Sequence, residues 1–428
     1  MQTTLAASFK DTPQGREADS ILRSCVHCGF CLATCPTYQI LGDELDSPRG
    51  RIYLMKQMLE GGPVTADTQL HLDRCLTCRA CETTCPSGVK YSKLLDIGRA
   101  VAEEKVERSQ WIALKRYALR KILPYRQRFA LLFGVARWVR GVLPPEIRAK
   151  IPDGSSATRL PWPPARHARK VVLLEGCVQP TLAPEVNVAA ARVLDRLAVS
   201  VVRIASAGCC GAVAHHMSAH EETLQQIRNN VDAIWPHIQL GAEAVVMTAS
   251  ACTAMLTDYG TLLAADPAYA ERARRITALA RDLSEVVLAE RQALGEALRS
   301  ADASAKPGPK VAFQSPCTLQ HALKVRGPVE SLLEQAGFTL THVPDSHLCC
   351  GSAGTYSILQ PELSARLLSA KVATLEQGQP ALIATANIGC HLHIRSGTTV
   401  PVHHWVELIA TRLGSAAGGP PMSDQNRL

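Results

Sequence analysis

Short apolar runs alternate with longer amphipathic stretches throughout the second half of the chain. The runs that read as buried strands are 170–174, 200–204 and 244–249, followed by 310–313, 339–343 and 381–386. The stretches between them repeat their apolar residues at helical spacing, which predicts helices near 185–198, 220–240, 327–336 and 361–377. Alternation of short strands with helices is typical of the α/β class with parallel sheets. We therefore predict two successive α/β lobes.

The cysteines of this half recur at a fixed interval. Three cysteines of one lobe return 140 residues later, and a fourth returns after 138 residues. They are Cys177, Cys209, Cys210 and Cys252 in the first lobe, and Cys317, Cys349, Cys350 and Cys390 in the second. A constant offset indicates a repeated unit. Because each cysteine follows a predicted strand, the repeat predicts two duplicated cysteine-rich (CCG) lobes with four thiols at the ligand-binding edge of each sheet.

Four thiols on three neighbouring loops can hold a metal centre. A further iron–sulfur cluster in one or both lobes and a zinc ion held by four thiolates are both open on this pattern. A redox-active thiol pair is disfavoured because adjacent cysteines are strained as a disulfide. Inert buried thiols are common in protein cores, but they would not explain the repeat. The eight lobe cysteines are therefore candidate ligands, with cluster and zinc as alternatives.

The first hundred residues have helical periodicity instead. Between 51 and 59 the apolar residues follow helical spacing, and Gly61 with Gly62 ends the stretch. Around this helix lie two copies of the spacing C-x2-C-x2-C-x3-C followed by proline, at 25–36 and 75–86. We therefore predict a mostly helical domain built around two cysteine loops, which differs from a compact βαβ ferredoxin.

The spacing of these two cysteine runs is typical of bacterial ferredoxins. There it holds cubane [4Fe–4S] clusters, and the fourth cysteine of each run ligates the other run's cluster. We predict one cluster held by Cys25, Cys28, Cys31 and Cys85, and a second held by Cys75, Cys78, Cys81 and Cys35. Two structural zinc sites are disfavoured, because zinc has no use for a third cysteine at the next step of each run.

Positive charge is concentrated in one segment. The net charge is +8, yet residues 105–150 contain twelve Lys or Arg and only two Glu. The segment predicts two amphipathic helices, separated by Pro124 and ended by Pro144 and Pro145. Such helices lie on an anionic membrane surface or pack on protein, and amphipathy alone does not separate the two cases. We expect packing on protein and keep a peripheral membrane contact open.

The cysteine content and the motifs that are absent narrow the functions that this chain can have. Sixteen cysteines behind an N-terminus without an apolar signal segment argue for metal or redox chemistry in a reducing cytoplasm. No stretch is long and apolar enough to predict a membrane-spanning helix. The sequence contains no Gly-rich nucleotide motif and no nucleophile elbow. We therefore predict no flavin, nicotinamide or nucleic-acid site, and no catalytic residue on this chain.

These patterns divide the chain into five parts. They are a helical ferredoxin-type domain with two clusters at 1–100, a basic helical bridge and Pro-rich linker at 101–169, a first CCG lobe at 170–300, a second at 301–414 and a disordered tail at 415–428. The histidines near the cysteine loops are His27, His215, His216, His321, His347, His391 and His393. Because a lone histidine is more often hydrogen-bonded than metal-bound, we expect structural roles for them, and we expect His27, inside the first cluster loop, to tune or cover the cluster.

Whole segments of the sequence resemble the iron–sulfur subunits of flavin-linked dehydrogenases, above all those of bacterial glycolate oxidases. The segments are ADSILRSCVHCGFCLATCPTYQILGDELDSPRGRIYL, HLDRCLTCRACETTCPSGVKY, AGCCGAV, PDSHLCCGSAGTY and TANIGC. The resemblance extends over residues 16–412. The iron–sulfur subunits of anaerobic glycerol-3-phosphate dehydrogenase and D-lactate oxidases, and heterodisulfide reductase, are relatives with the same two kinds of motif.

The resemblance implies a division of labour within a hetero-oligomer. A partner subunit that binds FAD would oxidise glycolate to glyoxylate, with D-lactate to pyruvate as the related reaction. This chain would relay single electrons to a quinone or another membrane acceptor, at the cytoplasmic face of the inner membrane. The alternatives are the same role in a D-lactate or glycerol-3-phosphate dehydrogenase, or a catalytic subunit like that of heterodisulfide reductase.

One position in each repeat departs from the heterodisulfide reductase pattern, in which the last element is a Cys-x2-Cys pair. The earlier position is Ala249 in the first repeat and Asn387 in the second. Each lobe therefore offers four thiols where the full pattern offers five. This difference disfavours a noncubane cluster and catalysis on a disulfide substrate.

Overall fold

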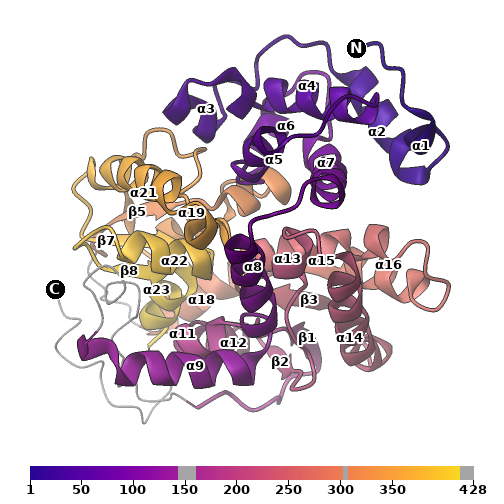
Figure 1. Cartoon of the computed structure of the whole chain (residues 1–428). Coiled ribbons are helices and arrows are strands. Elements are labelled where there is room, and N and C mark those ends of the chain that lie inside the picture. The colour runs from indigo at the N-terminus through magenta and orange to yellow at the C-terminus, as the bar shows by residue number, and fades with distance from the viewer. Residues whose placement is uncertain (143–160, 302–306, 415–428) are drawn as a thin grey trace.

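The computed structural model describes residues 1–142, 161–301 and 307–414 (Figure 1). A helical N-terminal unit lies above two α/β lobes in this view, and the bridge helices extend along the lobes. The predicted tail at 415–428 and the part of the bridge and linker at 143–160 lie outside the described residues. The predicted fold class, a helical ferredoxin-type domain followed by two duplicated α/β lobes, is confirmed.

The N-terminal unit is a small bundle of short helices. They are α1 (Ala7–Lys10), α2 (Pro13–Ser24), α3 (Pro36–Leu41), α4 (Pro48–Leu59), α5 (Ala66–Asp73), α6 (Ala80–Thr84) and α7 (Tyr91–Lys105), with a 3-10 turn at Glu44–Asp46. Thr12 and Ser47 cap α2 and α4, each ahead of a proline at the first helical position. Leu22, Met55 and Leu94 from α2, α4 and α7 are buried together, so an apolar core holds the helices.

The first lobe is a parallel sheet with helices on both faces. Its strands are β1 (Arg169–Leu173), β2 (Val199–Arg203), β3 (Ala244–Met247) and β4 (Ala280–Asp282), in the order β2-β1-β3-β4. Its helices are α11 (Gln179–Leu182), α12 (Pro184–Arg196), α13 (Ala212–His215), α14 (His220–Gln239), α15 (Ser250–Leu262), α16 (Ala270–Leu279), α17 (Leu283–Ala289) and α18 (Arg291–Ala301).

The second lobe repeats this topology. Its strands are β5 (Lys310–Gln314), β6 (Thr339–Leu340), β7 (Leu382–Thr385) and β8 (Val402–His404), in the order β6-β5-β7-β8 and again parallel. Its helices are η3 (Thr318–Ala322), α19 (Pro328–Gln335), α20 (Tyr356–Leu359), α21 (Pro361–Glu376), α22 (Ile388–Arg395) and α23 (Trp405–Arg412). The identical strand order confirms that the cysteine offset marks a structural duplication.

The sequence patterns missed the fourth strand of each sheet. β4 reads Ala-Arg-Asp and β8 reads Val-His-His, so neither contains an apolar run. Both are edge strands of three residues, which pair with a neighbour on one side only. An edge position tolerates polar residues, so pairing with β3 and β7 decides these strands rather than local pattern.

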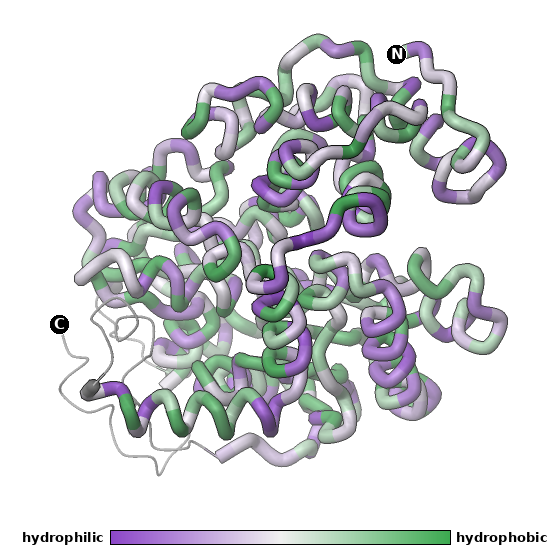
Figure 2. Tube along the Cα trace, in the orientation of Figure 1, coloured by the Kyte–Doolittle hydropathy of each residue, from purple (hydrophilic) through white to green (hydrophobic). Residues whose placement is uncertain are grey.

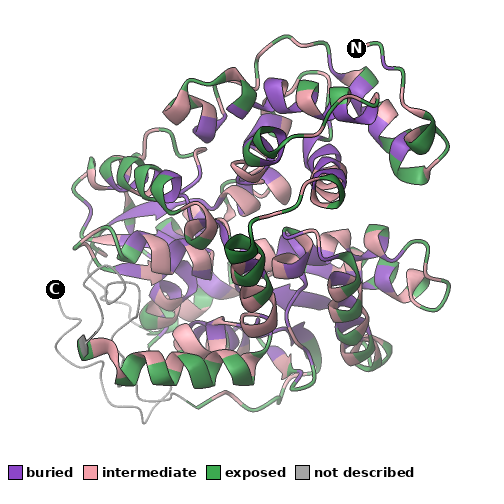
Figure 3. Cartoon of the chain, in the orientation of Figure 1, coloured by how far each residue is buried: buried purple, intermediate pink, exposed green. Residues whose placement is uncertain are grey.

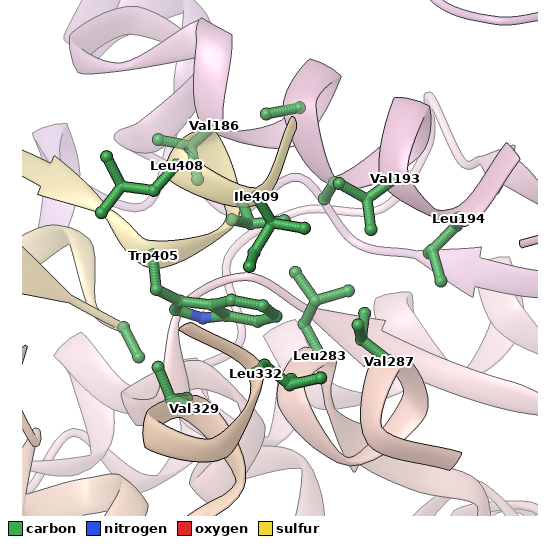
Figure 4. Close-up of a cluster of buried hydrophobic side chains, with 14 of the residues drawn as sticks. Val186, Val193, Leu194, Leu283, Val287, Val329, Leu332, Trp405, Leu408 and Ile409 are labelled. Carbon is green, nitrogen blue, oxygen red and sulfur yellow. The ribbon is translucent and has the colours of Figure 1, made fainter. Parts of the chain in front are cut away.

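The two lobes share one apolar core. Trp405 at the start of α23 is 1% exposed and lies among side chains of α12, α17 and α19 (Figure 4). Val193 and Leu194 come from the first lobe, whereas Val329 and Leu332 come from the second. His404 also donates a hydrogen bond across the boundary, from Nε2 to the carbonyl oxygen of Thr248 at 2.8 Å. These contacts hold the two sheets in a fixed relation.

The basic bridge forms two helices, α8 (Gln110–Ile122) and α9 (Arg126–Trp138), followed by a 3-10 turn at Arg140–Val142. α8 packs on this chain: Arg116 is buried and donates to the carbonyl oxygen of Met217 at 3.0 Å, and Lys121 pairs with Glu222 at 2.9 Å. By contrast, α9 buries none of its residues, and it combines apolar positions with an exposed surface (Figures 2 and 3). Within the described residues, no helix is both long enough and apolar enough to cross a bilayer.

Candidate metal centres

The two cysteine loops of the helical unit share one backbone conformation. In each loop the second cysteine is flanked by residues with positive φ: His27 (57°) and Gly29 (85°) in the first, Thr77 (55°) and Arg79 (60°) in the second. Only glycine adopts this region freely, and other residues pay roughly 1–2 kcal/mol each. Because the two loops share these strained conformations, they bend in the same way around their cysteines.

Each loop borders a cavity lined by several thiols. The first cavity is lined by Cys25, Cys28, Cys31, Cys85 and also Cys81, and the second by Cys35, Cys75, Cys78 and Cys81. The structure therefore brings together the two crossed sets that the spacing predicts. Pro48, Cys81 and Tyr91 border both cavities, so the two are immediate neighbours. The four soft sulfur donors of each predicted set fit a [4Fe–4S] cluster, although the ligand assignment stays a prediction.

Burial raises the pKa of several of these thiols, those of Cys25, Cys31, Cys78 and Cys81. It raises the pKa of the Cys31 thiol to about 11, and the neighbouring thiol of Cys25 adds to the rise. Cys78 and Cys81 have pKa values raised well above the usual range, again mainly by burial. Because only the thiolate is a metal ligand, cluster assembly must release these protons.

A buried ion network supports the second cavity. Arg51 borders that cavity, and its Nη2 donates to Asp46 Oδ1 at 3.1 Å, with both side chains fully buried. The same carboxylate accepts from Arg74 at 2.8 Å and lies 3.1 Å from Nδ1 of His71. Sequence reasoning missed this network. The only local signal was an arginine inside the helical segment 51–59.

Each lobe gathers its four thiols into one group. In the second lobe, Cys317 and Cys349 have their sulfurs 3.8 Å apart, and Cys350 and Cys390 have theirs 3.3 Å apart. In the first lobe the thiols form the same chain of contacts, in the order Cys177, Cys209, Cys210, Cys252. The glycine after each cysteine pair has positive φ, 97° at Gly211 and 89° at Gly351. The predicted gathering of four thiols per lobe is thus seen, while the bound metal stays open.

The position that departs from the five-thiol pattern has its own contact in the second lobe. Nδ2 of Asn387 lies 3.6 Å from Sγ of Cys390 and can donate to it. In the first lobe the corresponding Ala249 is buried and carries no polar atom on its side chain. An amide that donates to this sulfur stabilises negative charge on it, and the side chain of Asn387 offers no fifth thiol.

The histidines near the cysteine loops tie segments together. In His321, Nδ1 lies 3.0 Å from Oγ1 of Thr83, and Nε2 donates to the carbonyl oxygen of His347 at 2.9 Å. Nε2 of His391 donates to the carbonyl oxygen of Val402 at 3.0 Å. These contacts agree with the structural roles expected for His321 and His391.

His215 links the first lobe to the helical unit. Its Nε2 lies 3.3 Å from Oδ2 of Asp96, and with the exposed His216 these groups bring their donor atoms within 4.8 Å of one another. Burial is the largest single effect and acts to lower the pKa of His215, but the hydrogen bond to Asp96 and the negative charges of Asp96 and Asp258 together outweigh it, so the pKa is raised. Protonation therefore strengthens this contact between the two units.

We predict that this contact weakens with rising pH. A raised pKa in the folded state means that the stabilisation is complete below the ordinary histidine pKa of about 6.5 and is lost as pH rises through the higher folded value. Hydrogen exchange of the α13 amides, corrected for intrinsic rates, measures the free energy of opening this helix. That free energy should fall by about 1 kcal/mol at high pH. Asp96→Asn should remove the difference, and an unchanged pH response in that variant would contradict the prediction.

Comparisons with known proteins add to this geometry. A family model described as a 4Fe-4S dicluster domain matches residues 21–89, and one described as a cysteine-rich domain matches residues 171–257 and 311–395. The glycolate oxidase iron-sulfur subunit of Escherichia coli strain K12 is 53% identical over 413 residues, which cover 96% of this chain and 99% of that protein. The probable glycolate oxidase iron-sulfur subunit of Bacillus subtilis strain 168 is 30% identical over 88% of this chain and 89% of that protein. Lactate utilization protein A of Exiguobacterium sp. is 28% identical over 56% of this chain and 96% of that protein.

Proposed function

Because this chain belongs to the family of glycolate oxidase iron–sulfur subunits, we propose that it carries single electrons away from a flavoprotein subunit that oxidises glycolate to glyoxylate. The observation that carries the proposal is the shared wall between the two thiol-lined cavities. Iron–sulfur clusters exchange single electrons at potentials set by nearby charge, hydrogen bonds and burial. Two such sites side by side suit a relay that starts from a two-electron donor.

The first cavity lies beside an exposed loop that a partner can reach. Cys28 is exposed, and the loop around it presents Val26 and Phe30, which are 65% and 64% exposed. Apolar side chains held around a redox site are suited to docking, because they exclude water when a partner covers them. The flavoprotein subunit therefore docks over this loop, and the second cavity with its buried Arg51–Asp46 pair lies further along the path.

The test uses a complex purified through a tag on this chain under anaerobic conditions. Glycolate should reduce its clusters, which can be followed by visible bleaching and electron paramagnetic resonance, and D-lactate is the second substrate to compare. Phe30→Glu should slow this reduction by about tenfold or more without loss of iron, as expected for an interface hot spot. The matched control is Leu240→Glu, an exposed apolar residue on another surface. Absence of a flavoprotein from the purified complex would overturn the proposal.

The acceptor side of the proposal is a quinone or another acceptor at a membrane. α8 and α9 present exposed apolar side chains, among them Trp111 (73% exposed), Leu131 (70%) and Trp138 (86%). Arginines of α9 lie between these apolar positions, an arrangement that favours the interface of an anionic bilayer. The basic residues of α8 that pair with Glu103 or Glu222 serve this chain's own packing instead.

We predict that the two tryptophans provide the membrane contact. The double variant Trp111→Ser with Trp138→Ser should bind vesicles of anionic phospholipid about tenfold less tightly, because two large apolar side chains no longer leave water. Co-sedimentation with vesicles measures this, with Leu240→Ser as the control. Equal binding of wild type and double variant would show that this face does not meet the bilayer.

A further inference from the structure

We propose that the hydroxyl groups of Tyr91 and Thr37, together with the buried cation of Arg51, hold the centre of the second thiol set at a higher reduction potential than that of the first. Electrons that enter beside the exposed loop then pass inward. The proposal rests on the electron-carrying role proposed above and adds the direction of flow inside the helical unit. The first predicted set is Cys25, Cys28, Cys31 and Cys85, and the second is Cys35, Cys75, Cys78 and Cys81.

The ring of Tyr91, at the start of α7, borders both cavities, but its hydroxyl serves the second set. Tyr91 is 4% exposed, and its Oη donates to Sγ of Cys75 across 3.7 Å. A hydroxyl that donates to a ligand sulfur stabilises the negative charge that arrives with an electron, so it makes reduction easier. The side chain that separates the two cavities therefore favours the electron on one side of it.

Backbone donors do not distinguish the two sets, because the duplicated loops repeat them. The amide of Thr77 donates to Sγ of Cys75 at 3.4 Å. At the equivalent place in the first loop, the amide of His27 hydrogen-bonds to the thiol of Cys25. A difference in potential between centres of the same type then has to come from side-chain donors, charge and access of water.

A second hydroxyl lies beside a thiol of the second set. An offset of 50 residues relates the two cysteine runs and aligns Thr37 with Ser87. Oγ1 of Thr37 lies 3.3 Å from Sγ of Cys35 and accepts from Nη1 of Arg51 at 3.2 Å. Its own proton is within reach of Cys35 and of the carbonyl oxygen of Asp46 at 2.9 Å. Ser87 borders the first cavity, but among the described residues its hydroxyl has no hydrogen bond to a thiol.

Buried positive charge also favours the second set. Arg51 is fully buried beside the second cavity, and it shares the carboxylate of Asp46 with Arg74. Two guanidinium groups against one carboxylate leave one positive charge in excess. Arg99 adds another cation, because its Nη2 donates to the carbonyl oxygen of Cys75 at 2.7 Å. In a buried site with little water, such charges act strongly on an added electron.

The cations near the first set are paired or partly solvated. Arg49 borders the first cavity and pairs with Glu44 at 2.8 Å, and their side chains are 33% and 43% exposed. The ammonium group of Met1, in a partly buried position, donates to the carbonyl oxygen of Cys25 at 2.7 Å. Because both cations are partly exposed, water screens them more than it screens Arg51.

Access of water acts in the opposite direction while the first loop is free. Cys28 is exposed, and water beside a centre stabilises its reduced, more negative state. Docking of the flavoprotein over Val26 and Phe30, as proposed above, removes that water. The first centre then becomes harder to reduce, whereas the hydroxyl groups and Arg51 beside the second set lie inside this chain and are unaffected. The order of potentials is therefore expected in the complex.

The redox step is a transfer of one electron. The reduced flavin of the partner subunit supplies the electron, the centre of the first set passes it on and is oxidised again, and the centre of the second set is reduced. No bond is made or broken, and no proton moves, because the hydroxyl of Tyr91 donates to Cys75 in both redox states. The higher potential of the second centre opposes return of the electron to the flavin.

The test is an anaerobic redox titration of the purified complex, followed by electron paramagnetic resonance. Cys85→Ser and Cys35→Ser each remove one predicted ligand of one set and so assign the two signals. In wild type the midpoint potential of the second centre should lie above that of the first. Tyr91→Phe keeps the ring and removes the hydroxyl. It should lower the equilibrium constant for inward transfer by about threefold to tenfold, or about 30–60 mV at about 59 mV per tenfold change, without moving the first midpoint potential.

The matched control is Tyr356→Phe. Tyr356 is also buried beside the second loop, but its hydroxyl donates to the carbonyl oxygen of Arg74 at 3.1 Å instead of to a sulfur. Its loss should leave both midpoint potentials unchanged. Iron content should stay at the wild-type level in both variants, because no ligand is lost. Equal shifts of the second midpoint potential in the two variants would show an effect of packing and would overturn the role of Tyr91.

A second set of variants decides the matter if Tyr91→Phe loses iron or does not fold. Thr37→Val removes the hydroxyl beside Cys35 and should lower the second midpoint potential, whereas Thr37→Ser keeps a hydroxyl and should retain the wild-type value. Ser87→Ala, at the equivalent place in the other run, should leave the first midpoint potential unchanged. A second midpoint potential that does not differ between Thr37→Val and Thr37→Ser would contradict the role of this hydroxyl.

Failure of this inference and failure of the proposed function give different results. If glycolate reduces the centres but the second midpoint potential of the complex lies at or below the first, the relay stands and the inward direction is refuted. A second midpoint potential that is unchanged in both Tyr91→Phe and Thr37→Val refutes the role of the hydroxyl groups. If glycolate reduces neither centre, the proposed function is refuted, while titration with a chemical reductant still measures the order of the two potentials.

Discussion

Replacing Asp46 with asparagine is expected to destabilise the helical unit by about 3–5 kcal/mol, the usual cost of breaking a buried ion pair by removing one partner. Asp46 and Arg51 are both fully buried, and Arg74 and His71 approach the same carboxylate. Without it, the guanidinium of Arg51 keeps its charge in a site with little access to water. Anaerobic urea unfolding, followed by circular dichroism and by loss of cluster absorbance, measures the change.

The control is an ion pair of the same unit at the surface. Lys93 and Glu17 lie 3.8 Å apart and are 36% and 47% exposed, so Glu17→Gln should cost no more than about 0.5 kcal/mol. The double variant Asp46→Asn with Arg51→Met should recover much of the lost stability, because the uncompensated charge is gone. A similarly small effect of Asp46→Asn and Glu17→Gln would contradict the buried pair as a determinant of stability.

Replacing Cys85 with serine is expected to remove or convert the cluster at Cys25, Cys28 and Cys31, although Cys85 belongs to the other run of the sequence. Cys85 lines the first cavity with those three thiols, whereas Cys75 and Cys78 of its own run line only the second and Cys81 borders both. Iron should fall by about one to four per chain, because the site is left with three thiolates. Iron analysis and resonance spectra of the reduced protein measure this, and the signal of the second cluster should persist.

Cys35→Ser is the mirror experiment and should affect the cluster at Cys75, Cys78 and Cys81. Ser87→Ala serves as the control, because Ser87 also lines the first cavity but offers no thiolate. If Cys85→Ser spared the first signal and abolished the second, ligation would follow the runs of the sequence, and the crossed arrangement would be wrong.

Much of the fold could be predicted because its signals are local. The strands β1, β3, β5 and β7 are short apolar runs, and buried parallel strands need such runs wherever they lie in a sheet. β4 and β8 have no such run, and only pairing with a neighbour makes them strands. The bridge helices show the same limit of prediction from local sequence. Their amphipathic pattern correctly predicted two helices, but whether Arg116 faces solvent or Met217 depends on the lobe beside it.

The cysteines could be read from the sequence because metal ligation restricts both residue type and spacing. Thiols on one tight loop must recur at fixed short intervals, and a duplicated lobe must repeat its cysteines at a constant offset. The two ferredoxin runs and the eight lobe cysteines were therefore recognisable without a structure. So was the departure at Ala249 and Asn387, which limits each lobe to four thiols.

The tertiary structure alone decided how these sites relate to one another and to charge. Arg51 and Lys371 look like ordinary surface residues in sequence, yet both are buried beside cysteines because partners from distant segments enclose them. Cys349 and Leu76 lie in one apolar cluster although they are 273 positions apart in the sequence, so no local pattern predicts this contact. Spacing along the chain determined which thiols can share a metal. Only packing between units, which depends on shape over long sequence separations, decided which of those thiol groups lie next to each other.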